Sequence, residues 1–110
     1  MSWRVWTVGK LLYGLPPVEI DLTDRELAHV KVVIITKLRR SEMFALTVDG
    51  RIGSNPSGRQ VLWIHPSIPL QFQFDGLGED KLNRTWLEEL MASANGGGSL
   101  RISPEPAESH

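Results

Sequence analysis

The sequence predicts a single α+β domain, with a mainly antiparallel sheet and two helices on one of its faces. Short segments alternate apolar with polar residues, whereas two longer segments repeat apolar residues at helical spacing. Their order along the chain is β-β-α-β-β-β-α-β, which is typical of this class. The length of 110 residues suits one domain. We expect this domain over residues 9–103, between a doubtful N-terminal extension at 1–8 and a disordered polar tail at 104–110.

A β-hairpin is predicted at the start of the domain. Residues 10–13 are mostly apolar, Gly14 to Pro17 interrupt the pattern, and residues 18–22 alternate apolar with acidic side chains. Strict alternation indicates a strand with one buried and one solvent-facing side, and a Gly/Pro break between two such runs indicates a hairpin.

A helix is predicted over about residues 24–40. Thr23 and Glu26 have the spacing of a capping box, in which each side chain accepts a hydrogen bond from the other residue's backbone N–H. The β-branched run at 30–36 would suit a strand. Matched charges at both ends and the length favour the helix, with Lys37 off its apolar stripe.

Three strands are predicted to follow as an antiparallel meander. They cover residues 43–48, 60–64 and 70–74. Asp49-Gly50 is suited to the tight turn after the first strand, because both residues tolerate positive φ. Trp63, on the second strand, is expected to face the core.

A second helix and a last short strand complete the predicted order. Leu82, Trp86 and Leu90 fall at helical spacing, and the helix is expected to start near Asn83 and to end at the glycines that follow Asn95. The last strand is expected around residues 100–102.

Composition and charge exclude several classes of protein. The chain has no cysteine, which excludes a disulfide framework, a cysteine-ligated metal site and a thiol nucleophile. Its longest aliphatic run, residues 32–35, is far shorter than the ~18 apolar residues of a membrane span. The N-terminus lacks the apolar region of a secretory signal. We therefore expect a cytoplasmic protein with no membrane partner.

Five phrases follow one another along the chain: Gly9–Gly14, Leu27–Val30, Lys37–Arg40, Trp63–Leu70 and Asn83–Trp86. Together they resemble a family of short uncharacterised actinobacterial proteins, over about residues 8–106. The resemblance implies no established activity, although some members carry the label ATP-dependent DNA ligase. It also suggests Val8 as an alternative to Met1 for the start of the natural chain, because such relatives tend to begin near the first of these phrases.

The ligase label is not supported by the residues that ligase chemistry requires. Ligases of this kind attack ATP with the lysine of a Lys-x-Asp-Gly motif, and Thr47 takes the place of that lysine before Asp49-Gly50. The segment 53–60 has the glycine spacing of a phosphate-binding loop. However, Arg59 and Gln60 stand where that loop needs Lys and Ser or Thr.

The histidines do not form a predicted site either. His29, His65 and His110 lack the spacing of a metal site. His65 and Ser67 could pair as base and nucleophile, but the sequence offers no acid to orient them. We expect no catalytic residue, metal or cofactor, and the sequence favours a protein that is not an enzyme.

The candidate nucleic-acid-binding residues are five cations: Lys37, Arg39 and Arg40 at the end of the first helix, and Arg51 and Arg59 in the loop that follows the next strand. Several cations in one region could neutralise several phosphates. The alternative is that a helix C-terminus attracts cations for its own stability.

The sequence therefore predicts a non-catalytic binding module that acts through self-association or a protein partner. The alternative is a DNA-associated accessory domain that uses the five cations and has no ligase activity of its own. Four tryptophans are many for one small core. Trp3 and Trp6 lie on opposite faces of the expected first strand, so at least one of them is expected to be exposed, and an exposed aromatic beside a sheet edge indicates a contact with protein or with nucleic acid.

Overall fold

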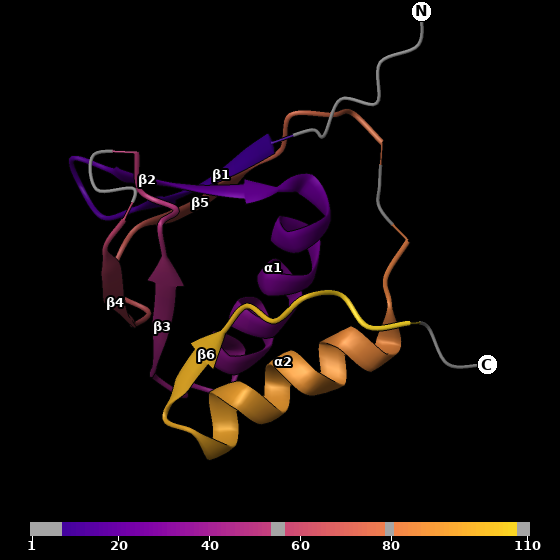
Figure 1. Cartoon of the computed structure of the whole chain (residues 1–110). Coiled ribbons are helices and arrows are strands. Elements are labelled where there is room, and N and C mark those ends of the chain that lie inside the picture. Colours follow the sequence, from indigo (N-terminus) through magenta and orange to yellow (C-terminus); the bar gives the residue numbers. More distant parts are fainter. Residues whose placement is uncertain (1–7, 54–56, 79–80, 108–110) are drawn as a thin grey trace, which may run out of the picture.

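The computed structural model describes residues 8–53, 57–78 and 81–107, and within them the predicted order of elements is confirmed (Figure 1). The elements are β1 (Val8–Tyr13), β2 (Val18–Thr23), α1 (Asp24–Arg39), β3 (Phe44–Asp49), β4 (Arg59–Ile64), β5 (Leu70–Gln73), α2 (Arg84–Gly96) and β6 (Ser99–Arg101). Trp3 and Trp6 lie outside the described residues.

The strands form two three-stranded sheets that are mostly antiparallel. One sheet has the order β2-β1-β5 and the other the order β4-β3-β6, in which β6 runs parallel to β3. A bridge between Ile20 and Ile52 joins the sheets, beside a hydrogen bond of 2.7 Å from Asp21 N to Arg51 O. The two helices pack against each other and lie to one side of the strands (Figure 1).

The predicted meander is wrong in its third strand. β5 pairs with β1, with Leu70 opposite Tyr13, and not with β4. The five residues between β4 and β5 include Pro66 and Pro69, whose fixed backbone angles and missing N–H groups do not suit a tight hairpin. The two strands therefore diverge, and the outer edge of β4 has no neighbouring strand in the described part of the chain.

Helix α1 begins with the predicted capping box. Glu26 N donates to Thr23 Oγ1 over 3.1 Å, and Thr23 N donates to the Glu26 carboxylate over 2.9 Å. The same carboxylate accepts two hydrogen bonds from the Arg51 guanidinium, at 2.7 and 2.8 Å. Burial by itself raises the pKa of Glu26, but the bonds from Arg51 and Thr23 outweigh it and lower the pKa. One carboxylate thus connects the helix to the loop after β3.

The two tryptophans of the described residues differ in their surroundings. Trp86, on α2, is 2% exposed and lies in the core, as predicted. Trp63 is 53% exposed, which corrects the expectation that it faces inward. Its neighbours Leu62 and Ile64 are both buried, and successive side chains of a strand point to opposite faces, so Trp63 must point outward.

Helix α2 begins as predicted, directly after its N-cap Asn83, whose side chain accepts from the N–H of Trp86. Leu82, which was expected on the apolar stripe of this helix, precedes it and is partly exposed.

Candidate functional site

The five predicted cations do not form one patch. Lys37, Arg39 and Arg40 lie at the C-terminal end of α1, whereas Arg51 bonds Glu26 at the other end of this helix, which is roughly 24 Å long. Arg59 lies on β4 with its Nε 3.4 Å from an Asp49 carboxylate oxygen. If these residues contact nucleic acid, as predicted, they do so as separate groups and not as one patch.

Lys37 is buried, which corrects its expected place off the apolar stripe of the helix. Only 5% of the residue is exposed, and its ammonium group donates to Asn95 Oδ1 over 2.5 Å and to Glu42 Oε1 over 3.1 Å. It also lies 5.6 Å from the centre of the Phe44 ring. Lys37 thus connects the ends of the two helices and has little contact with solvent.

Arg39 and Arg40 are the two predicted cations whose exposed side chains form no hydrogen bond or ion pair with the rest of the described chain, although the backbone N–H of Arg40 caps the helix through Lys37 O. With Thr36 they line a surface depression of about 280 Å³.

The residues compared with ligase and phosphate-loop motifs have structural roles. Thr47 is buried in β3, where its hydroxyl group hydrogen-bonds that of Ser99. Residues 54–56 of the glycine-containing loop lie outside the described residues, and the segment after the loop is strand β4, not a helix. A strand cannot direct a helix N-terminus at a phosphate group.

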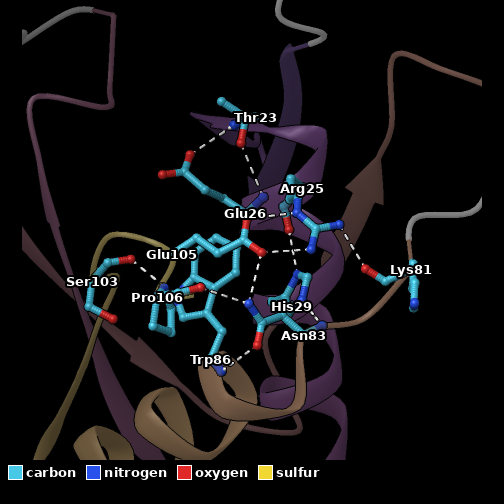
Figure 2. A network of polar contacts seen from close by, with 10 residues as sticks. All are labelled: Thr23, Arg25, Glu26, His29, Lys81, Asn83, Trp86, Ser103, Glu105 and Pro106. Atoms are coloured by element: carbon cyan, nitrogen blue, oxygen red, sulfur yellow. Dashed lines mark hydrogen bonds and ion pairs between the residues drawn. The ribbon is translucent and has the colours of Figure 1, made fainter. Parts of the chain in front are cut away.

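His29 is fully buried, and both of its ring nitrogens have partners (Figure 2). The backbone N–H of Asn83 donates to Nε2 over 2.8 Å, so the proton resides on Nδ1, which donates to Arg25 O over 2.7 Å. The ring also packs against Trp86, with 4.5 Å between ring centroids. His29 holds α1 to the start of α2 and has no free nitrogen for a metal or a substrate.

A polar clasp continues from this histidine to the C-terminal segment (Figure 2). The Arg25 guanidinium donates to both oxygens of Glu105 over 2.7 and 2.6 Å, and the Asn83 amide donates to Glu105 and to Pro106 O, each over 2.9 Å. The bonds from Arg25, followed by that from Asn83, lower the pKa of Glu105 to about 2. Residues 105 and 106 of the predicted tail are thus tethered to the domain.

The clasp predicts a specific acid sensitivity. A carboxyl group with a lowered pKa stabilises the fold fully above its ordinary pKa of 4.5, and the contribution is lost as the pH falls through about 2. Because the pair is partly exposed, we expect only about 1 kcal/mol from it. E105Q should therefore lose less stability than the parent chain between these pH values, measured by urea denaturation. E88Q, at an exposed position of α2, is the control and should keep the parent's acid response; equal acid responses of E105Q and E88Q would contradict the prediction.

His65 and Ser67 form a surface turn. Nδ1 of His65 accepts from Ser67 N over 3.0 Å and lies 2.8 Å from Ser67 Oγ, while Ile68 N donates to His65 O over 3.0 Å. Among the described residues no carboxylate hydrogen-bonds this ring, and no three His, Asp or Glu residues are placed to hold a metal ion. His110 lies outside the described residues.

A hollow of about 400 Å³ lies between α1 and the segment that leads from β5 to α2. Apolar side chains dominate its lining, among them Val32, Phe74 and Leu82, and the Lys31 ammonium lies 5.6 Å from the centre of the Phe74 ring. The hollow brings together no set of reactive groups.

The free edge of β4 is the feature of the surface that most resembles a binding site. Gly50 N donates to Gly58 O over 2.9 Å, which makes these two residues a hydrogen-bonded pair of the β3–β4 ladder. Since such pairs alternate, the N–H and C=O groups of Arg59, Val61 and Trp63 point away from β3. The hydroxyl group of Tyr13 donates to Trp63 O over 2.9 Å on this side, which agrees with that assignment.

Apolar side chains accompany the free edge. Val61 and Trp63 are 62% and 53% exposed, on the sheet face opposite the core. Met43, which is also exposed, directly precedes β3 and is two residues before Ala45, the residue opposite Trp63. We call the outward backbone groups of β4 together with Val61 and Trp63 the β4 edge surface. It was missed from the sequence, although the alternation of Val61 and Trp63 with Leu62 and Ile64 was a signal for it.

The chain matches the model of a known protein family. The model of the domain of unknown function DUF7882 matches residues 8–105, which include all eight elements. The chain belongs to the DUF7882 family. No curated protein and no solved structure shows significant similarity to the chain. Among the described residues of this DUF7882 domain, no helix is both long and apolar enough to cross a membrane.

Proposed function

We propose that the domain is a non-catalytic binding module that takes up an extended strand of a protein partner along the β4 edge surface. The observation that carries this proposal is a strand edge with outward main-chain groups beside two exposed apolar side chains, Val61 and Trp63. Addition of a strand to such an edge forms main-chain hydrogen bonds, while contacts at alternate side chains select the partner.

The composition of β4 supports this proposal. Proteins commonly protect a free edge with proline, with charged residues or by keeping the strand short. β4 has six residues, no proline and one charged side chain, and that side chain, Arg59, is at its first position. The middle of the edge is left apolar, and this is the composition expected of a surface that pairs.

The proposal is tested with a synthetic peptide of residues 58–65, lengthened by terminal lysines for solubility. We expect the peptide to shift and protect the backbone amides of Val61 and Trp63 in NMR spectra. V61K should weaken binding by about tenfold, because it places a charge on the edge. The control, Q71K, adds the same charge to an exposed position of β5 and should bind as the parent does. If these amides are unprotected in the parent chain alone, their remaining unchanged at millimolar peptide would refute edge binding. An equal loss of binding in V61K and Q71K would refute it as well.

A second candidate, the DNA-associated accessory domain, is favoured by the exposure of Arg39 and Arg40 beside one surface depression. Binding through these residues would weaken with salt and would be lost in the charge-reversed double variant R39E/R40E. A shift assay with duplex DNA at low salt measures this binding.

The cytoplasmic location of the protein stays a prediction.

A further inference from the structure

We infer that the strand taken up by the β4 edge surface is β4 of a second copy of this chain, paired antiparallel with Val61 on the two-fold axis. The inference rests on the proposed function and names its partner. It would join two three-stranded sheets into one of six strands.

Two-fold symmetry limits the possible registers. The exposed faces of the two copies lie on the same side of the joined sheet only if a residue whose side chain is on the exposed face lies opposite another such residue. The two-fold axis therefore passes through a residue and not between two. The two central choices are Val61 and Leu62. They differ in which backbone groups find a partner.

The axis through Val61 satisfies more of the edge. It places Val61 opposite Val61 of the other copy, and Arg59 of each copy opposite Trp63 of the other. All three residues whose N–H and C=O groups point outward are then paired. An axis through Leu62 pairs only Val61 with Trp63 and moves Arg59 beyond the end of the strand. The Trp63 carbonyl already accepts from Tyr13, but a carbonyl oxygen has a second lone pair for the ladder.

Side-chain electrostatics favour the same register. Arg59 opposite Trp63 brings a guanidinium group to an indole ring, an attractive pair of charge and aromatic face. No like charges lie opposite each other along the strand, and Asp49 already balances Arg59 within each copy. The net charge of −1 per chain causes little repulsion between copies.

The absence of cysteine from the chain allows a direct test, because any introduced cysteine is unique. Sedimentation equilibrium should show a dimer of the parent chain, and V61K should shift it to monomer while Q71K does not. V61C chains should form an intermolecular disulfide under mild oxidation, whereas Q71C chains should not.

Two results would overturn the inference. Cross-linking in a mixture of V61C and W63C chains, but not in V61C alone, would place the axis at Leu62. A parent chain that is monomeric at millimolar concentration would exclude the second copy as partner. In that case, protection of the Val61 and Trp63 amides by the peptide would still support the proposed function, so the two failures are distinguishable.

Discussion

Replacement of Trp86 by alanine is expected to lower the free energy of unfolding by about 4 kcal/mol. The side chain is almost fully buried, so its removal leaves a large cavity between the helices and the sheets. The variant also loses the packing of the indole against His29 and the hydrogen bond of 3.1 Å from Trp86 Nε1 to Ser103 O. Such a loss is a large part of the ~5–15 kcal/mol that stabilise a domain. Urea denaturation followed by circular dichroism measures it.

The matched control for this variant is W63A. It removes an identical side chain that is half exposed, so we expect a change of about 1 kcal/mol or less. Equal losses from W63A and W86A would show that the two tryptophans are not placed as described. W86F, which retains much of the apolar volume but no N–H group, should lie between parent and W86A.

Replacement of Gly9 by alanine is expected to cost about 2–3 kcal/mol. A Cβ atom at this position would lie 2.7 Å from Gln73 O, 2.8 Å from Asp24 Oδ1 and 2.8 Å from Leu27 Cδ2. One of these contacts is backbone of the neighbouring strand, so the methyl group must separate β1 from β5 or displace Asp24. The Asp24 carboxylate accepts from the N–H groups of Asp75 and Gly76 over 3.0 and 2.8 Å, and its displacement would release that segment.

The control for Gly9 is Gly53, where an added Cβ atom meets nothing within 4 Å. G53A should leave stability unchanged or raise it by a few tenths of a kcal/mol, because alanine reduces the entropy of the unfolded chain. Thermal and urea denaturation of both variants provide the comparison. A G9A protein as stable as the G53A protein would contradict the close approach of β1 to α1.

Local signals in the sequence were sufficient to predict the elements but not all of their neighbours. Helix α1 was predicted within one residue of its end because its caps and terminal charges lie within a few residues of each other. The pairing of β5 with β1 joins residues about sixty positions apart, and no local pattern encodes it. The core-facing side of β4 was likewise ambiguous, since Val61 to Ile64 are all apolar.

The candidate site was harder to predict because it depends on distant partners. Lys37 was expected off the apolar stripe, yet Asn95, 58 positions away in sequence, gives its ammonium group a buried partner. Arg51 is likewise engaged by Glu26, 25 positions before it. A cluster of cations read from the sequence therefore included side chains that the fold uses internally. The β4 edge surface, in turn, exists only because β5 pairs elsewhere.

The parallel pairing of β6 with β3 has a consequence for biosynthesis. Of the described elements β6 leaves the ribosome after the other seven, and β3, made some fifty residues earlier, lacks its partner until then. A nascent chain that ends before residue 99 exposes both edges of the β3–β4 hairpin, and such unpaired edges promote aggregation in incompletely made proteins. Ser99 to Arg101 thus act as the closing strand, and truncation just before them should yield a polypeptide that depends on chaperones.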